Sequence, residues 1–236
     1  MLLVSQNAPV PVYFKMLPSR GFWVETACLR LAEATGLPVG ECYWGEITRE
    51  NLPSSAMWQD GESQRMVVCV RIIRGATLYA MGLYSVANTL RKHQAFAKMC
   101  VLDELLANGD RHNENVMIDG KKCPILIDFG HAFGGPENPF TNTMPLFENE
   151  MLSEAIATMD VRRRQAFGVD LSDAINEIKD AMPTLNEALA SCPFRSELLG
   201  FVNARMTVLR ELLAIRLNIG QRQQALVLPT RPVIQR

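Results

Sequence analysis

The sequence predicts an α+β fold in which a small strand-rich part and a larger, mostly helical part enclose a shared cleft. The chain has 236 residues, enough for one large domain or two small lobes with a core of their own. Residues 1–75 contain apolar runs typical of strands and one helical pattern, whereas residues 76–221 are mostly helical and are interrupted by one hairpin. Gly75 ends the most apolar run of the first part. We therefore place the boundary between the two parts there.

The strand-rich part begins with two runs that can pair. Residues 10–16 are rich in β-formers around a single lysine, Lys15, and residues 1–4 can pair with them across a short loop. The two prolines near the start of the longer run indicate an edge or the beginning of a strand.

A helix and a buried strand complete this part. Residues 22–35 predict a helix, because apolar residues recur every three or four positions, Gly36 suits the position after its end, and Pro38 stops it. Residues 38–62 are expected to form a looser stretch. Residues 65–74 are almost continuously apolar, as in a central strand that is buried on both faces.

The second part is helical around a hairpin. Residues 85–107 show one helical stripe that ends at Asn108-Gly109. Residues 116–118 and 125–127 then flank Asp119-Gly120, and Asp-Gly between two apolar runs is a strong hairpin signal.

The remainder is predicted to be a long loop followed by two helices. The loop covers residues 134–145, one helix is stopped by Pro183, and the last helix runs from Ser196 to Gly220. Residues 222–236 are expected to be a loose tail.

Composition excludes several classes of protein. Hydrophobic residues make up 48% and charged residues 21%, and the formal net charge is −1, so no global positive field draws the chain to nucleic acid or to an acidic membrane. No apolar run approaches a membrane span, and the first residues lack the pattern of a secretory signal. The six cysteines are far apart, which indicates reduced thiols rather than a zinc site or a disulfide framework. We expect a soluble, cytoplasmic protein.

The chemistry concentrates around the hairpin. Asp110 lies just before it, Asn115 follows five positions later, and Asp128 stands at its far end. A hairpin brings these side chains to one end, where one carboxylate can accept or orient the proton of a nucleophile. The amide oxygen and the second carboxylate can hold Mg²⁺ against nucleotide phosphates. The spacing therefore indicates phosphoryl transfer.

These motifs resemble the kinase-like superfamily, in its atypical branch. Asp-Arg-His-Asn-Glu-Asn from position 110, followed by Ile-Asp-Phe-Gly-His from position 127, is similar to phosphoinositide kinases. The lead-in at 103–110 and the Leu-Ala…Gly-Leu-Pro stretch at 31–38 are more similar to HipA-like kinases. The resemblance is dense over residues 101–133. It implies a two-lobed, protein-kinase-like fold with an abbreviated N-lobe at 1–75 and a mainly helical C-lobe at 76–221.

The resemblance also implies roles for residues outside the hairpin. Lys15 would orient the α- and β-phosphates of ATP, and Glu25 in the following helix would hold that lysine. Adenine would lie under the strand that contains Val68 and Val70. No glycine precedes Gly21, so the usual glycine-rich phosphate cover is absent. Residues 5–9 could replace it through backbone N–H groups and the hydroxyl of Ser5.

Catalytic-loop residues are assigned in the same way. Asp110 would be the base or orienter, while Asn115 and Asp128 would bind Mg²⁺. For His112, a part in proton movement or phosphate contact and a structural part stay equally open. Asp103 is expected to buttress the loop, with Arg111 pairing a carboxylate. We interpret His131 as an ordinary histidine without a part in the reaction.

The function expected from this site is Mg²⁺-dependent transfer of the γ-phosphoryl group of ATP to a protein Ser/Thr hydroxyl. Residues 133–147 contain no Lys or Arg that could hold a phosphoinositide headgroup. The resemblance to HipA-like kinases further implies a bacterial or phage regulatory or toxin-type kinase with a regulator or antitoxin as partner. The alternatives are a pseudokinase that only binds, an AMP transferase or a lipid kinase on the same fold.

Overall fold

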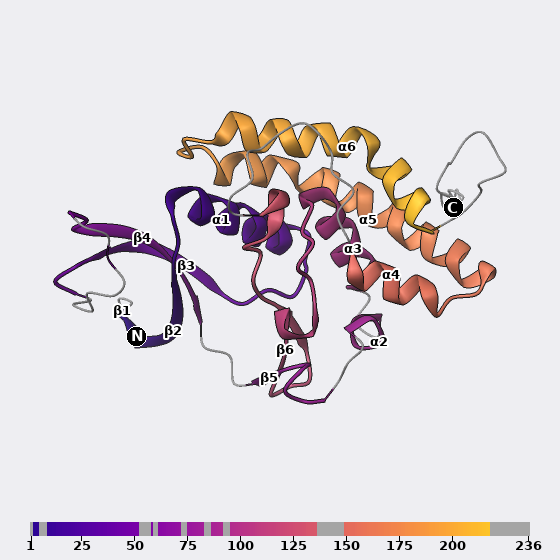
Figure 1. Ribbon diagram of the computed structural model, residues 1–236, viewed down its shortest axis with the longest axis horizontal. Helices are drawn as coiled ribbons and strands as arrows, with labels where there is room; N and C mark the ends of the chain where they lie inside the picture. The colour runs from indigo at the N-terminus through magenta and orange to yellow at the C-terminus, as the bar shows by residue number, and fades with distance from the viewer. Residues whose placement is uncertain are drawn as a thin grey trace, which may run out of the picture.

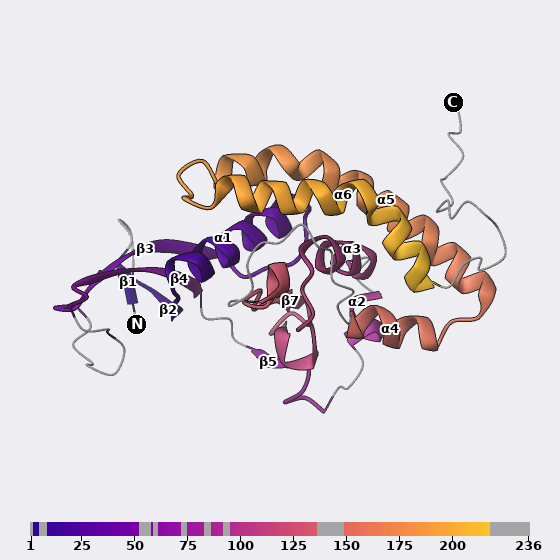
Figure 2. The ribbon, with the colours of Figure 1, turned by 45° about the horizontal axis from the view of Figure 1, so that its top comes forward.

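The computed structural model describes residues 2–4, 9–51, 58, 61–71, 75–82, 86–91, 95–135 and 149–217. Figures 1 and 2 show a twisted sheet at one end of the molecule and a long pair of helices along one side. A second, smaller sheet lies between the first sheet and the remaining helices. Residues 5–8, 72–74, 92–94, 136–148 and 218–236 are among those outside the described residues, so the predicted loop over 5–9, most of the loop over 134–145 and the tail are not described.

A four-stranded antiparallel sheet has the order β1-β2-β4-β3. Its strands are β1 (Leu2–Val4), β2 (Pro9–Met16), β3 (Cys42–Thr48) and β4 (Gln64–Arg71). The predicted pairing of the first two strands and the central position of β4 are confirmed. The loose stretch expected over 38–62 is corrected, because it contains β3. The proline-bearing half of β2 pairs with β1, and only its second half pairs with β4.

The register of this sheet sets which residues share a face. Lys15 stands opposite Val68, and Val68 stands opposite Trp44, so these three side chains lie on the same face. Helix α1 (Ser19–Ala34) packs against β4 on this face. The opposite face carries a small separate cluster of buried residues, made of Val12, Ile47, Trp58, Val67 and Cys69. The sheet thus presents Lys15 toward α1.

The predicted hairpin is confirmed and has a third strand. Strands β6 (Val116–Asp119) and β7 (Pro124–Leu126) pair with each other, and β5 (Gly75–Thr77) adds to β6. Strand β5 is only three residues long, and the sequence pattern does not predict it. Gly75 is required there, because a Cβ at this position would come within 2.0 Å of the Ile118 carbonyl oxygen.

The remaining elements are helical. They are α2 (Val86–Arg91), α3 (Phe96–Leu106), α4 (Glu150–Ala157), α5 (Val161–Ala188) and α6 (Arg195–Leu217), with 3-10 turns η2 (Asn113–Asn115) and η3 (Ala132–Gly134). One large core joins α1, β4, β6, β7 and α2–α6. Within the described residues, no helix is long and apolar enough to cross a membrane.

Two helix predictions need correction. The single helix expected over 85–107 is two helices, α2 and α3. The stop expected at Pro183 does not occur, because α5 continues to Ala188. Pro183 and Lys179 are both on the exposed face, so water can bond the Lys179 carbonyl that loses its helical partner. Leu185 and Leu189 continue the buried face beyond the proline.

Candidate active site

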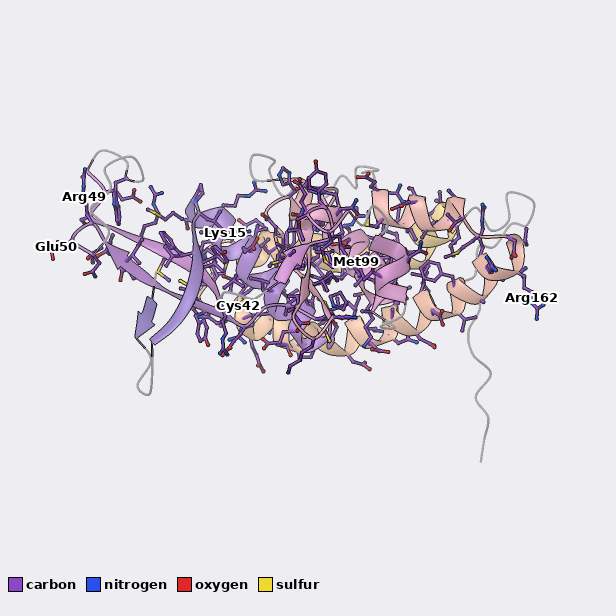
Figure 3. All side chains as sticks on the ribbon, turned by 90° about the horizontal axis from the view of Figure 1, so that it is seen from below. Lys15, Cys42, Arg49, Glu50, Met99 and Arg162 are labelled. Carbon is purple, nitrogen blue, oxygen red and sulfur yellow. The ribbon has the colours of Figure 1, made fainter. Side chains whose placement is uncertain are left out.

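Lys15 connects two carboxylates from distant parts of the chain. Its Nζ lies 3.0 Å from Glu25 Oε1 on α1 and 2.9 Å from Asp128 Oδ1 just after β7. The second oxygen of Glu25, Oε2, accepts a hydrogen bond from the Phe129 backbone N–H at 3.0 Å. Figure 3 shows Lys15 at the inner end of the large sheet, far from Arg49 and Glu50 at the outer end. The sheet, α1 and the segment after the hairpin therefore meet at Lys15.

Burial and charge act against each other in this group. Burial lowers the pKa of Lys15, but the ion pairs with Glu25 and Asp128 together raise it above its ordinary value. Burial raises the pKa of Glu25, which is 1% exposed, despite the neighbouring lysine. For Asp128, burial is outweighed by Lys15 and by the Gly130 N–H, so the pKa of Asp128 is lowered. Lys15 is therefore kept charged by two carboxylates, of which Glu25 is buried and Asp128 is partly exposed.

Asp128 has an uncommon backbone conformation. Its φ is 59°, in the left-handed region that non-glycine residues adopt rarely, although aspartate tolerates it better than most. The Gly130 N–H donates to Asp128 Oδ1 at 3.0 Å, which locks the side chain onto the turn. This turn aims the Asp128 carboxylate at Lys15.

The loop between α3 and the hairpin carries the other candidate residues. The Asn115 Nδ2 donates to the Asp110 carbonyl oxygen at 2.5 Å and lies 3.4 Å from Asp110 Oδ2. His112 Nδ1 accepts from the Glu114 backbone N–H at 3.2 Å, so Nε2 bears the proton of the neutral ring. That Nε2 lies 3.5 Å from Asp110 Oδ1. Asp110 is therefore flanked by the amide of Asn115 and by the ring of His112.

His131 also reaches this loop. Its Nε2 lies 3.8 Å from Asp110 Oδ2, so the two histidines face different oxygens of one carboxylate. The sequence interpretation of His131 as ordinary missed this proximity. Its position directly after Asp-Phe-Gly was the available signal.

A buried arginine fastens the loop to the segment that bears Asp128. Arg111 is 2% exposed and pairs with Asp103, as expected, at 3.2 Å. Its Nη1 donates to the carbonyl oxygens of Asn115 at 3.1 Å and Ile127 at 2.7 Å. Asp103 also accepts from Asn108 Nδ2 at 2.8 Å. One guanidinium thus holds the backbone next to Asn115 and next to Asp128.

The other residues that the sequence predicts to contact ATP differ in their burial. Val68 is completely buried in the core beneath Lys15, whereas Val70 is partly exposed. Ser5 lies outside the described residues. The region thus brings together Lys15, Glu25, Asp110, His112, Asn115 and Asp128.

The donor set suits magnesium only in company with phosphate. Within the described residues, no group of three or more His, Cys, Asp or Glu side chains could hold a metal ion. Asn115 and Asp128 supply one amide oxygen and one carboxylate, which are hard ligands of the kind Mg²⁺ prefers, and phosphate oxygens and water usually complete its shell. The residues therefore fit a metal–nucleotide complex better than a free metal ion.

Comparisons with known proteins bear on the fold of the chain and on the family of part of its sequence. Residues 89–197, a little under half of the chain, match the family described as phosphatidylinositol 3- and 4-kinase. A crystal structure of CtkA, a proinflammatory kinase of Helicobacter pylori, is similar with a TM-score of 0.53. That match has 14% sequence identity and covers 93% of this chain and 91% of the other. No curated protein matched the sequence. The chain therefore has a kinase-like fold.

Proposed function

We propose that this chain is an ATP-dependent phosphotransferase that modifies a protein Ser/Thr hydroxyl with the help of Mg²⁺. The observation that carries the proposal is the contact of Lys15 with both Glu25 and Asp128, beside the linked pair Asp110 and Asn115. The kinase-like fold and the family match over 89–197 support it. We also infer the two-lobed division at residue 75, because Lys15 and the hairpin residues face one another from opposite sides of it.

Each side chain has a chemical part in the proposal. Bound Mg²⁺ would neutralise phosphate charge during transfer. Asn115 and Asp128 would hold that ion, and Glu25 keeps Lys15 charged and directed at the phosphates. The oxygen of the acceptor hydroxyl would bond to the γ-phosphorus of ATP, and ADP would depart as the leaving group. Asp110 would accept the proton that this hydroxyl loses.

His112 would act on Asp110 rather than on the acceptor. Its Nε2 faces Asp110 Oδ1, and its Nδ1 is engaged with the loop backbone. A neutral imidazole in this tautomer orients the Asp110 carboxylate through Oδ1. The hydroxyl would then approach Oδ2, where His131 Nε2, at 3.8 Å, would lie beside it.

The adenine ring and the phosphates of ATP would contact different parts of the protein. Val70 and the neighbouring exit of β4 would contact adenine, while Val68 would support Lys15 from the core. Ser5 and its loop would cover the phosphates in place of a glycine-rich loop.

We favour a protein acceptor over a lipid one. The family matched over 89–197 takes its name from phosphatidylinositol, but residues 133–147 of this chain offer no Lys or Arg to an anionic headgroup. A neutral peptide hydroxyl has no such requirement.

Labelled ATP tests the reaction directly. Purified chain incubated with Mg²⁺ and γ-labelled ATP should label itself or an added protein mixture. It should leave phosphatidylinositol vesicles unlabelled, and α-labelled ATP should give no transfer. Asp110→Asn and Asp128→Asn should abolish the transfer, whereas Asp119→Asn, in the hairpin turn away from the site, should retain it.

Other outcomes contradict specific parts of the proposal. Transfer of the α-label would indicate an AMP transferase, and labelling of vesicles would indicate a lipid kinase. Absence of transfer, with ATP and Mg²⁺ still raising the melting temperature, would indicate a binding module.

A further inference from the structure

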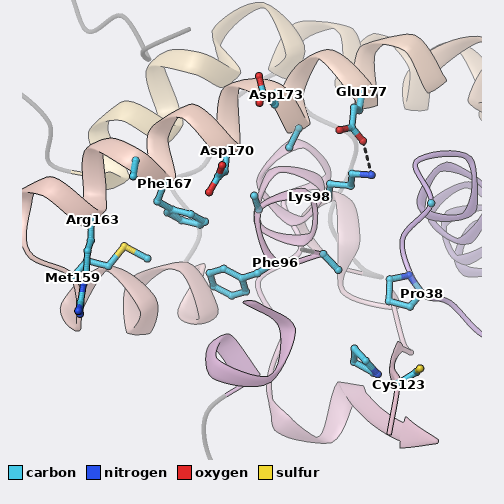
Figure 4. Close-up of a pocket in the computed structure, with 16 residues that line it drawn as sticks. Pro38, Phe96, Lys98, Cys123, Met159, Arg163, Phe167, Asp170, Asp173 and Glu177 are labelled. Atoms are coloured by element: carbon cyan, nitrogen blue, oxygen red, sulfur yellow. Dashed lines mark ion pairs between the residues drawn. The ribbon is translucent and has the colours of Figure 1, made fainter. Parts of the chain in front are cut away.

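Helix α1 is fastened to the second part of the chain at both of its ends. At its C-terminal end, the Thr35 carbonyl oxygen accepts a hydrogen bond from Lys98 Nζ on α3 at 2.9 Å. Figure 4 shows that Lys98 also pairs with Glu177 on α5. At the N-terminal end of α1, Arg20 Nη1 donates to the Gly135 carbonyl oxygen at 3.3 Å. The contact of Arg20 joins α1 to the segment that leaves the candidate active site.

We call residues 129–135 the exit segment, and α1 holds both of its ends. Glu25 Oε2 accepts a hydrogen bond from the first N–H of the exit segment at 3.0 Å, and Arg20 holds its last carbonyl oxygen. The 3-10 turn η3 forms the second half of the segment and packs against α1. His131 is the N-cap residue of η3, so the direction of its side chain follows from how η3 is held.

The second half of the exit segment has an uncommon backbone conformation. Three successive residues, 133–135, have φ values of 59°, 81° and 98°. A phenylalanine at the first of these positions is strained and persists only where surrounding contacts hold it. The ring of Phe133 packs against Phe201, with the ring centroids 5.1 Å apart, and Arg20 closes the end of the turn. Loss of the contact with Arg20 would therefore let this turn relax.

We propose that Arg20 is a positioning residue that keeps His131 beside Asp110. The bond of Arg20 to the Gly135 carbonyl fixes η3, and η3 fixes the backbone of its N-cap residue. His131 Nε2 then stands 3.8 Å from Asp110 Oδ2. The importance of this geometry for the reaction rests on the proposed function, whereas the geometry itself can be tested without it.

The residues proposed to contact the phosphates and Mg²⁺ do not depend on Arg20 in this way. Asp128 Oδ1 is held by the Gly130 N–H at 3.0 Å and by Lys15 at 2.9 Å. Loss of Arg20 should therefore slow the step in which Asp110 accepts a proton and leave the binding of ATP unchanged.

Histidine NMR tests the positioning without any reaction. His112 and His131 both lie beside Asp110, so Asp110→Asn should shift the ring signals of both. In the Arg20→Met background, the shift of the His131 signal should fall by about half or more. The shift of the His112 signal should stay the same, because His112 is in the same loop as Asp110. An undiminished His131 shift in Arg20→Met would overturn the proposal.

Lys98→Met is the matched control, because it removes a side-chain bond to a carbonyl at the other end of α1. The backbone amides of Ala132 and Gly135 both donate within the exit segment. Their hydrogen exchange should become roughly ten-fold faster in Arg20→Met and change by less than about two-fold in Lys98→Met. Arg20→Lys, which keeps a cationic donor, should restore most of the protection. Equal acceleration in Arg20→Met and Lys98→Met would show that Arg20 only stabilises α1, and would contradict the proposal.

Kinetics connect the positioning to the proposed transfer. Arg20→Met should lower kcat roughly ten-fold and leave KM for ATP within about two-fold of its value, and Arg20→Lys should recover most of kcat. A higher KM for ATP with unchanged kcat would assign Arg20 to nucleotide binding and overturn the proposal. If the native chain transfers no phosphate, the proposed function fails, while NMR and hydrogen exchange still decide whether Arg20 positions His131.

Discussion

Lys15 neutralises two carboxylates whose charges would otherwise repel each other. Glu25 is almost completely buried, and burial already raises its pKa above the ordinary 4.5. Lys15→Met removes the cation, so in the folded protein the pKa of Glu25 should rise further and the lowered pKa of Asp128 should rise as well. The folded state then binds more protons than the unfolded state from about pH 4.5 upward, and the free energy of unfolding falls as pH rises. Urea unfolding should show a larger loss for Lys15→Met at about pH 8 than at about pH 5.

Removal of the buried acid provides the control for this prediction. In Lys15→Met/Glu25→Gln, the amide cannot ionise, so most of the additional pH dependence should disappear. An equal loss of stability at both pH values in the single variant would show that Lys15 does not govern the ionisation of Glu25.

Arg111 fixes the backbone next to Asn115 and Asp128 and does not touch substrate. A lysine can keep one ion pair with Asp103 but cannot reproduce the planar fork that also reaches the carbonyls of Asn115 and Ile127. Arg111→Lys should lower the free energy of unfolding by roughly 2–4 kcal/mol. It should also raise the Mg²⁺ concentration needed for half-maximal transfer, because the two proposed ligand segments separate.

Arg30 is partly exposed, pairs with Glu33 and lies over the Trp44 ring, and it supplies a matched substitution because a lysine can keep both contacts. Arg30→Lys should change stability by less than about 0.5 kcal/mol and leave the Mg²⁺ dependence as it is. A loss of stability in Arg111→Lys with an unaltered Mg²⁺ dependence would assign Arg111 a purely structural part.

Sequence reasoning reached the acidic and amide residues because their positions follow from local structure. One hairpin brings Asn115 and Asp128 together whatever the rest of the fold does. The ion pair of Arg111 with a carboxylate was predicted, but its contacts with two backbone carbonyls and the approach of His131 to Asp110 were not, since they depend on how η2 and the segment after β7 pack. Spacing identifies candidate residues, but tertiary contacts decide which neighbours support them.

At the scale of elements, predictions were right where one pattern dominated and wrong where packing overruled it. Helix α1 and strand β4 have strong apolar patterns, and both were predicted. Strand β3 is weakly patterned and gains its place by pairing along the whole of β4. Helix α5 continues through Pro183 because its buried face resumes beyond the proline, which no local rule anticipates.

The proline in α5 gives a prediction for that helix. Pro183→Ala restores an N–H donor to the Lys179 carbonyl and removes the steric conflict of the ring with the preceding turn. The free energy of unfolding should rise by roughly 1–3 kcal/mol, measured by urea titration. Thr184→Ala, at the next exposed position, should change it by no more than about 0.5 kcal/mol. A destabilised Pro183→Ala protein would mean that the local bend at the proline is needed for packing.

At the scale of the whole molecule, buried charges join the helices that surround the core. Glu104 on α3 accepts hydrogen bonds at its carbonyl and carboxylate from Arg205 on α6, and its other oxygen pairs with Arg216 at 3.3 Å. Glu104 and Arg205 are each 1% exposed. Removing one partner of such a buried pair leaves the other uncompensated.

The continuity of the core predicts a single unfolding transition. The three tryptophans, Trp23, Trp44 and Trp58, all precede residue 75, so their fluorescence reports on the sheet and α1. Far-UV circular dichroism at the helix band reports mainly on α3, α5 and α6. Because one cluster of buried side chains runs from α1 and Val68 to Leu217, the two signals should change at the same temperature. Arg205→Met should lower both midpoints equally, by several degrees. A fluorescence transition that precedes the loss of helix would instead show that the two halves of the molecule unfold as separate units.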